Sequence, residues 1–211
     1  MDEALTDGTV TLLPLGPADF AAHYAGEDEE LVRWLSGDPA TPEGLRDYLD
    51  CCARWWRDGG PFHNFGIRVL PDLALAGTVD VQTGQYYLRE GQANLAYGLY
   101  PQWRGRGLAT RAVRLACGYA ASIGCTEAVI RCEPANTLSA AVAARAGFAF
   151  LQRRSEPDGR VLDWHTLDLR ALPAADRVLQ PPVEPGLVRH RGLSMSAPVP
   201  PERAGRGRIR S

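Results

Sequence analysis

One short segment, residues 102–110 (Gln-Trp-Arg-Gly-Arg-Gly-Leu-Ala-Thr), constrains the fold of this chain more than any other part of its sequence. It follows a run of strand-forming residues at 92–100 and opens the most regular helical pattern in the chain, residues 105–123. A strand that runs through a glycine-rich loop into a helix is typical of proteins that hold an anion at the start of that helix. The segment therefore predicts a strand–loop–helix unit.

The composition of the loop favours a phosphate group as that anion. Gly105 and Gly107 let the backbone turn with its N–H groups facing outward, because no Cβ is in the way. The helix N-terminus adds unpaired donors and about half a unit of positive charge. Arg104 and Arg106 supply full positive charges beside them.

The loop belongs to neither of the two commonest phosphate-binding types. A P-loop needs a lysine after its last glycine, and all 23 basic residues of this chain are arginine. The dinucleotide-binding fingerprint needs a third glycine where this chain has Thr110. Taken alone, the glycine pair fits an arginine-rich helix cap equally well.

The remaining periodicity predicts an α+β fold in one domain, residues 1–170. We expect a mixed, mostly antiparallel sheet of about six or seven strands flanked by helices, with one parallel β-α-β step around the loop. The expected strands lie at 9–15, 62–70, 73–83, 92–100, 127–133, 148–154 and 161–169, and the expected helices at 19–35 (interrupted near Gly26), 42–58, 105–123 and 136–146.

Charge separates this domain from the tail, residues 171–211. The tail holds seven arginines against three acidic residues, and it is rich in proline, so we expect it to be disordered or loosely docked. The domain is acidic, which argues against nucleic acid as its partner; contact with nucleic acid would fall to the tail. An acidic domain favours a cationic ligand by steering, although such charge also serves solubility. The acidic run 27–30 has the same two interpretations, a cationic substrate or a helix N-terminus.

Composition excludes several other classes. No run approaches the roughly 18 apolar residues of a membrane helix, and the N-terminus is acidic where a secretory signal is basic, so we expect a cytoplasmic protein. The five cysteines are odd in number without a C-x-x-C pair, and the four histidines are scattered. We therefore expect neither a disulfide framework nor a metal site.

Two motifs together resemble the GNAT superfamily of N-acetyltransferases. Residues 102–109 resemble its Q/R-x-x-G-x-G/A signature, and residues 97–101 resemble the strand that leads into it. Further on, Asn136 to Ser139 resemble a second motif, N-x-x-S, which opens a helix that ends in a Gly-Phe pair at 147–148. The resemblance covers residues 9–169. Ser139 and the early Arg-Trp-Leu at 33–35 look most like the branch of ribosomal-protein N-acetyltransferases.

The resemblance implies acetyl-CoA as acyl donor and no metal. Backbone N–H groups of the loop would hold its pyrophosphate, and a backbone N–H at Leu99 or Tyr100, on a bulged strand, would polarise its carbonyl. Asn136 would bond the pantetheine arm, or equally cap its helix. Arg145 would face the 3′-phosphate, or equally lie in solvent. The implied cofactor-binding residues are Leu99, Tyr100, Arg104, Gly105, Arg106, Gly107, Leu108, Ala109, Thr110, Asn136, Ser139 and Arg145.

For catalysis the resemblance implies Ser139 beside the leaving thiolate, Tyr100 through its backbone, and a base. A serine hydroxyl is a poor acid, so we expect it to orient the sulfur with effects of about ten- to a hundredfold. The base is open. Asp80 lies mid-strand without a structural purpose and is preferred over Asp163, which shares a strand face with His165. Glu133 is a third candidate, and water without a dedicated side-chain base would also serve.

The implied reaction is acetyl transfer to a primary amine by direct attack in a ternary complex. The acceptor is an amine-bearing small molecule or a peptide or protein N-terminus, and the protein is a monomer or homodimer. The competing interpretation is a non-catalytic acyl-CoA-binding or sensor domain.

Overall fold

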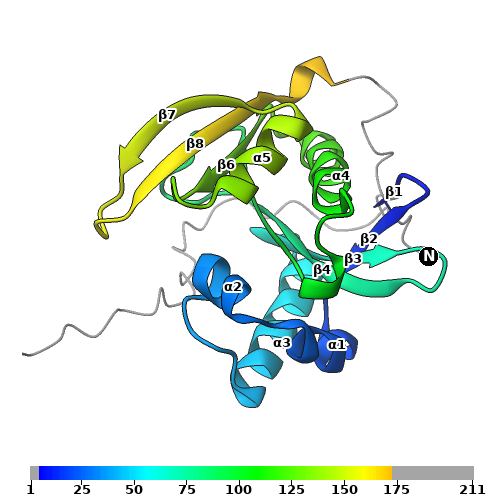
Figure 1. Ribbon diagram of the computed structural model, residues 1–211. Helices are drawn as coiled ribbons and strands as arrows, with labels where there is room; N and C mark the ends of the chain where they lie inside the picture. Colours follow the sequence, from blue (N-terminus) through cyan, green and yellow to red (C-terminus); the bar gives the residue numbers. More distant parts are fainter. Residues whose placement is uncertain (1–4, 173–211) are drawn as a thin grey trace, which may run out of the picture. The chain divides into compact units, whose positions relative to one another are not determined.

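The computed structural model describes residues 5–172 (Figure 1). Over this range eight strands form one sheet in the order β1-β2-β3-β4-β5-β6-β8-β7. Neighbouring strands are antiparallel except β5 and β6, which are parallel. The predicted α+β class is confirmed, and the strand that the sequence analysis missed is β1. The strands are β1 (Leu5–Thr6), β2 (Val10–Pro14), β3 (Phe62–Val69), β4 (Ala74–Gln82), β5 (Gln92–Leu99), β6 (Glu127–Cys132), β7 (Ala149–Ser155) and β8 (Val161–Asp168).

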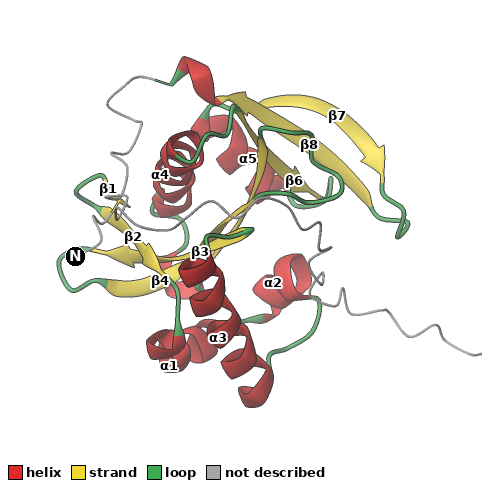
Figure 2. Cartoon of the chain, turned by 180° about the vertical axis from the view of Figure 1, so that it is seen from behind, coloured by secondary structure: helices red, strands yellow, loops and turns green. Residues whose placement is uncertain are grey.

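The helices lie on both faces of the sheet (Figures 1 and 2). One face carries α4 (Leu108–Ser122) and α5 (Thr137–Ala146), and the other carries α1 (Phe20–Gly26), α2 (Glu29–Leu31) and α3 (Pro42–Asp58). The π-helical turn η2 (Val32–Ser36) continues α2. The short 3-10 turns are η1 (Pro17–Asp19), η3 (Pro101–Trp103) and η4 (Leu169–Ala171).

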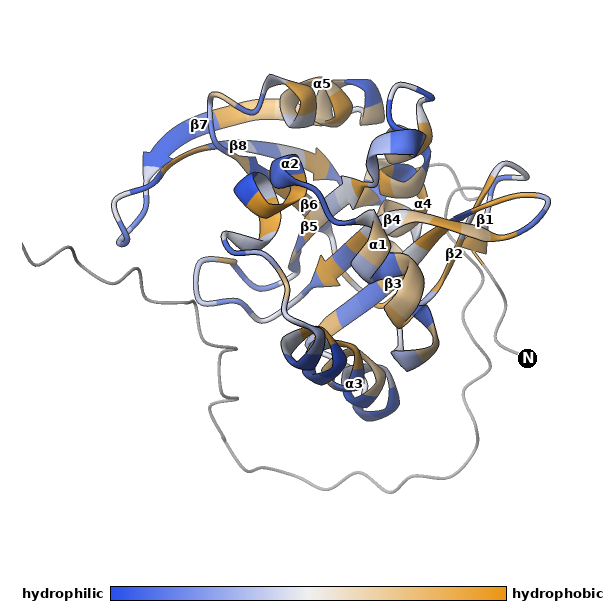
Figure 3. Cartoon of the chain, turned by 60° about the horizontal axis from the view of Figure 1, so that its bottom comes forward, coloured by the Kyte–Doolittle hydropathy of each residue, from blue (hydrophilic) through white to orange (hydrophobic). Residues whose placement is uncertain are grey.

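Helix α3 forms where its capping signals predict. The Thr41 hydroxyl accepts a hydrogen bond from Gly44 N at 3.1 Å, and Pro42 is the first helical residue. The helix ends at Gly59, whose φ of 79° is left-handed. Its buried stripe is Leu45, Leu49 and Cys52, while the opposite, hydrophilic side faces outward in Figure 3.

Helix α4 packs on the sheet through small side chains. Ala112, Ala116 and Ala120 are fully buried, and they share one core with Val79 of β4 and Leu95 of β5. Small residues let the helix backbone approach the strands closely, which holds the start of α4 at the end of β5. The loop between them is the predicted phosphate site.

The structure also bears on membrane helices, metal-binding groups and cysteine pairing within the described residues. No described helix is long and apolar enough to cross a membrane. Within residues 5–172 no group of three or more His, Cys, Asp or Glu side chains is arranged to hold a metal ion. All five cysteines are free thiols. Apart from Ala171 and Leu172, the tail lies outside the described residues, and so does its expected disorder.

Candidate active site

The two parallel strands separate partway along their length. Gln92 to Asn94 of β5 pair with Glu127 to Val129 of β6, although β5 continues to Leu99 and β6 to Cys132. Beyond that point no described strand pairs with the edge of β5 that faces β6. The resulting gap opens toward the carboxyl ends of both strands, where β5 leads into the glycine loop.

Backbone groups of β5 point into this gap. Tyr100 N donates to Ala76 O at 2.9 Å, so this pair is hydrogen-bonded. Bonded and non-bonded pairs alternate along antiparallel strands, and the N–H groups of Tyr97 and Leu99 therefore point away from β4. The expectation that Tyr100 N–H polarises a carbonyl is wrong, because it is bonded to Ala76 O. The Leu99 N–H is the backbone donor that points into the gap at this place. The expected bulge is also absent, since β4 and β5 pair without a register shift.

The glycine loop has the geometry of an anion site. Gly105 and Gly107 are exposed with φ of 75° and 73°, and a Cβ at either would meet nothing within 4 Å. The first helical hydrogen bond of α4 runs from Arg111 N to Gly107 O. The N–H groups of residues 108–110 (Leu108, Ala109 and Thr110) therefore have no helical acceptor, as the sequence analysis expected.

The two loop arginines differ in what they contact. Arg106 is exposed, with its guanidinium carbon 5.2 Å from the centre of the Trp103 ring, and no carboxylate among the described residues pairs with it. Arg104 instead donates to Leu99 O at 3.0 Å and forms ion pairs with Asp28 and Glu30. The expected side-chain contact of Arg104 with phosphate thus differs from what the structure shows, since its donors are occupied.

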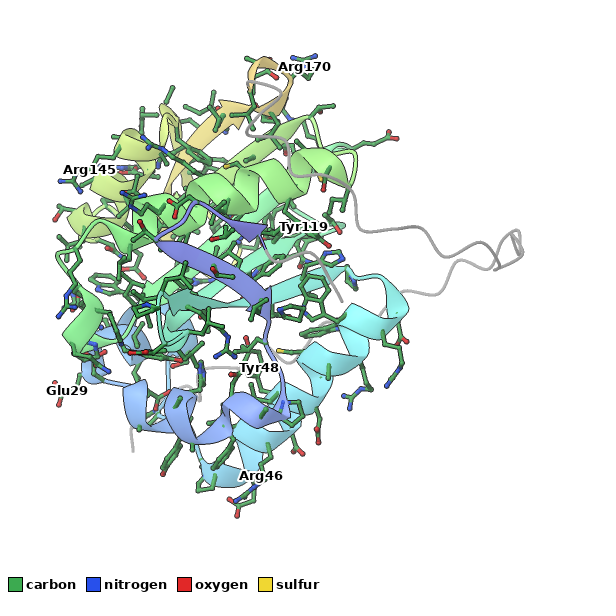
Figure 4. The ribbon with its side chains drawn as sticks, turned by 90° about the vertical axis from the view of Figure 1, so that its right-hand side faces the viewer. Glu29, Arg46, Tyr48, Tyr119, Arg145 and Arg170 are labelled. Atoms are coloured by element: carbon green, nitrogen blue, oxygen red, sulfur yellow. The ribbon has the colours of Figure 1, made fainter. Side chains whose placement is uncertain are left out.

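Asn136 and Ser139 lie at the start of α5. Asn136 Oδ1 accepts a hydrogen bond from Ser139 N at 3.0 Å, so Asn136 is the N-cap of this helix. Its amide nitrogen has no partner among the described residues and is the group available to a ligand. Arg145, at the other end of α5, is exposed at the surface (Figure 4), and its main-chain oxygen accepts from Arg114 at 2.6 Å.

Ser139 meets a tyrosine that sequence reasoning did not assign to the site. The Tyr97 hydroxyl lies 3.0 Å from Ser139 Oγ and 3.0 Å from Ser139 O. Burial raises the pKa of Tyr97 to about 12, so its phenol remains neutral at physiological pH. On the other side of the gap the Cys132 thiol, at the end of β6, also neighbours the Ser139 hydroxyl. Strand alternation was the signal: Tyr97 shares the α4-facing side of β5 with Leu95 and Leu99.

Asp80 lies on the opposite face of the sheet. Its strand neighbours Val79 and Val81 are buried against α4, so the Asp80 side chain points toward α3, opposite Asn64 and Ala96 in register. Its Oδ1 is buried without a hydrogen-bond partner. Burial raises the pKa of Asp80 to about 6. A carboxyl group with that pKa can accept a proton near neutral pH.

Tyr48 of α3 faces the same interior region, beneath the sheet in Figure 4. Burial, and then the charge of nearby Asp80, raises the pKa of Tyr48 well above its usual value. Tyr48 Oη also accepts from Asn64 Nδ2 at 3.4 Å. Asp80 is thus held among neutral polar groups rather than against a cation.

Of the two remaining candidate bases, Asp163 and Glu133, only Asp163 has a carboxylate paired with a cation among the described residues. Asp163 binds the Arg153 guanidinium through two bonds of 2.7 and 3.0 Å, and that pairing lowers the pKa of Asp163. Glu133 follows β6 and its main-chain oxygen accepts from Asn136 N at 2.8 Å. Asp80 is therefore preferred over Asp163, because Asp80 Oδ1 has no hydrogen-bond partner whereas both Asp163 oxygens bind Arg153.

The comparison with protein families identifies the class of protein to which this fold and loop belong. A family model described as an acetyltransferase (GNAT) domain matches residues 9–149. The chain therefore belongs to the GNAT acetyltransferase family. No curated protein sequence matches it.

Solved structures share the fold at low sequence identity. RimL, a ribosomal L7/L12 α-N-protein acetyltransferase in complex with coenzyme A, has a TM-score of 0.68 and 17% identity, covering 79% of this chain and 98% of that chain. The ribosomal-protein-S5-alanine acetyltransferase from Vibrio fischeri has a TM-score of 0.66 and 16% identity, covering 81% of this chain and 98% of that chain. AAC(6′)-Ib in complex with paromomycin and acetyl-CoA has a TM-score of 0.65 and 18% identity, covering 77% of this chain and 95% of that chain. At these identities the likeness shows a shared fold.

Proposed function

We propose that this protein is an acetyl-CoA-dependent N-acetyltransferase that transfers the acetyl group to a primary amine by direct attack in a ternary complex. One observation carries the proposal: the gap between β5 and β6 runs from the glycine loop past free N–H groups to the Tyr97–Ser139 pair. Asp80 lies on the adjacent strand, on the other face of the sheet. The donor-side groups therefore lie on one face of the sheet, and the acceptor-side carboxylate lies on the other.

The chain offers acetyl-CoA a complete set of contacts. The cofactor would supply an acetyl group activated as a thioester. The N–H groups of residues 108–110 suit its pyrophosphate because they have no helical acceptor, and the Arg106 side chain suits it because it is exposed and has no carboxylate partner among the described residues. Asn136 Nδ2 suits the amide groups of the pantetheine arm, and the exposed Arg145 suits the 3′-phosphate. Leu99 N–H then stabilises the negative charge that develops on the thioester oxygen.

Two groups manage protons on opposite faces of the sheet. An amine attacks only when neutral, and Asp80, directly or through water, accepts the proton that it loses. On the other face the Ser139 hydroxyl donates a hydrogen bond to the departing sulfur. Tyr97 fixes that hydroxyl: the Tyr97 proton bonds Ser139 Oγ, which leaves the single Ser139 proton free for the sulfur.

The acceptor belongs to the class of primary amines. RimL and the S5-alanine enzyme are named for acetylating ribosomal proteins, and AAC(6′)-Ib was solved with an aminoglycoside. A peptide N-terminus and an amine-bearing small molecule therefore both remain as acceptors, and the acidic domain favours a cationic one. We further propose that the protein acts in the cytoplasm.

A two-part experiment separates an enzyme from a domain that only binds acyl-CoA. Thermal unfolding is measured with acetyl-CoA and with CoA, and saturation at a hundredfold excess over Kd should add about 2.7 kcal/mol to the free energy of unfolding. Acetylated product is then sought by mass spectrometry with a panel of seryl-alanine amide, alanyl-alanine amide and paromomycin. Stabilisation with product supports the enzyme. Stabilisation without product from any amine supports the binding domain, and no stabilisation by either cofactor excludes both.

A further inference from the structure

Arg104 belongs to the glycine loop by sequence, but its side chain leaves that loop. Its Nη1 and Nη2 bind the two oxygens of Asp28 at 2.8 Å each, and Nη1 also binds Glu30 at 2.7 Å. Its Nε donates to Leu99 O at 3.0 Å. One guanidinium therefore joins three parts of the molecule: the loop, the end of β5 and the start of α2.

These contacts leave Arg104 little capacity for a phosphate. One positive charge faces two carboxylates, so the group as a whole is negative. The hydrogen bond to Asp28 is the main reason why the pKa of Arg104 is raised, and it likewise lowers the pKa of Asp28. An incoming phosphate would have to displace a bidentate carboxylate, which is the geometry that arginine binds best. Arg106, on the same loop, has no such competitor.

The helical segment that Arg104 holds lies on the acceptor side of the sheet. Leu31 and Leu35 pack directly over Gly98 of β5, where an added Cβ would come within 2.5 Å of Leu31 Cδ2 and 2.6 Å of Leu35 Cδ1. Gly98 pairs with Thr78, two residues before Asp80 on β4, and therefore points to the same face as Asp80. Segment 28–36 is thus a wall beside the proposed base.

We infer that Arg104 is a positioning residue for the acceptor site: it fixes segment 28–36 over β5, whereas Arg106 provides the loop's side-chain contact with the cofactor phosphates. This inference rests on the proposed function. It reassigns Arg104 from the donor half of the reaction to the acceptor half. Loss of Arg104 should therefore affect acceptor binding while leaving cofactor binding intact.

Matched variants separate the two halves. Arg104→Gln and Arg106→Gln remove the same charge from the same loop. Asp28→Asn breaks the ion pair from the other end, yet keeps an oxygen to accept the Leu31 N–H that Asp28 now caps at 3.0 Å. Titration calorimetry measures the Kd of CoA, steady-state kinetics give KM and kcat for the panel amine that wild type acetylates fastest, and amide hydrogen exchange reports on residues 31–36.

We expect Arg106→Gln to raise the Kd of CoA about tenfold, as for loss of a charge-assisted hydrogen bond, and Arg104→Gln to change it less than about threefold. Arg104→Gln and Asp28→Asn should each raise the acceptor KM about fivefold and speed exchange at residues 31–36. The double variant should be no worse than Arg104→Gln alone, because the Arg104–Asp28 ion pair is already lost in that variant.

Two results would overturn the inference: an Arg104→Gln variant that loses CoA affinity as severely as Arg106→Gln, or one whose exchange at residues 31–36 matches wild type. Failure of the proposed function looks different. If wild type bound no CoA and acetylated no amine, that function would fall, and exchange at residues 31–36 would still report whether Arg104 holds the segment.

Discussion

The Tyr97 hydroxyl lies 3.0 Å from Ser139 Oγ, and it joins a strand on one side of the sheet gap to the helix that flanks the gap. Both groups are neutral at physiological pH, since burial raises the pKa of Tyr97 to about 12. The pair can therefore orient or share a proton without carrying charge. In the proposed reaction it faces the sulfur that leaves.

Removing either hydroxyl should slow the chemical step. Ser139→Ala is expected to lower kcat about ten- to a hundredfold with little change in the KM for acetyl-CoA, because a weak acid contributes orientation. Tyr97→Phe should give a smaller loss, and the double variant should be close to Ser139→Ala alone, since the two act through one contact. Steady-state kinetics on the four proteins check this. Additive losses in the double variant would contradict the shared role.

A side chain at Gly107 should weaken cofactor binding, because L-residues disfavour the positive φ that this position of the loop requires. Gly107→Ala places a Cβ at a φ of 73°, which costs about 1–2 kcal/mol for an L-residue. We expect the Kd of CoA to rise at least about fivefold, since the loop must deform either before or on binding. Gly159→Ala is the control, because Gly159 has a similar φ of 85° in the β7–β8 turn. Equal loss of CoA affinity in both variants would count against the loop as the phosphate site.

Asp80 should govern the pH dependence of the rate. A general base acts when deprotonated, and the pKa of Asp80 is about 6, so kcat/KM should fall as the pH drops through about 6. Asp80→Asn should lose about a hundredfold or more in kcat at pH 8 and lose that inflection. A rate profile from pH 5 to 9 for both proteins tests this. An unchanged inflection in Asp80→Asn would assign it to another group.

The Asp80 carboxyl group should make the rate rise with pH but make the stability of the fold fall with pH. Its pKa is higher in the folded chain than the ordinary 3.8, so the folded state binds a proton more tightly than the unfolded state. Stability should therefore decrease as the pH rises from about 4 to 6. Asp80→Asn should consequently have a higher Tm than wild type at pH 8 and nearly the same Tm at pH 4, which thermal unfolding at the two pH values measures. A lower Tm at pH 8 would show that the ionised carboxylate stabilises the fold.

Asp163 provides the matched comparison for Asp80. Its carboxylate already binds Arg153, an exposed arginine on an edge strand, and such solvent-exposed pairs contribute little to stability. Asp163→Asn should therefore leave kcat within about threefold of wild type. A loss comparable with that of Asp80→Asn would move the base to the other face of the sheet.

Local patterns predicted much of this fold. The Thr41–Pro42 cap, the apolar stripe of α3 and the glycine loop before α4 are encoded within a few residues, and the structure has each of them. The N-cap role of Asn136 was also readable from its position before an alanine-rich helix. Such features depend on neighbours in sequence, which is why periodicity and capping rules find them.

The contacts within the site were harder to predict from the sequence, because they join residues far apart in the chain and depend on how the strands pair. Arg104 and Asp28 are 76 residues apart in the chain, and Tyr97 and Ser139 are 42 apart. Whether Tyr100 or Leu99 offers a free N–H depends on which pairs of β4 and β5 are hydrogen-bonded, and a shift of one residue would exchange the two. No local pattern carries that information.

A crystal structure of the protein with CoA bound tests the central claim most directly, through the distance from the CoA sulfur to Ser139 Oγ. The account predicts a sulfur within hydrogen-bonding reach of that hydroxyl, in the gap between β5 and β6, with the pyrophosphate on the N–H groups of residues 108–110. A CoA molecule whose sulfur lies outside the gap, or whose pyrophosphate contacts neither this loop nor Arg106, would contradict it.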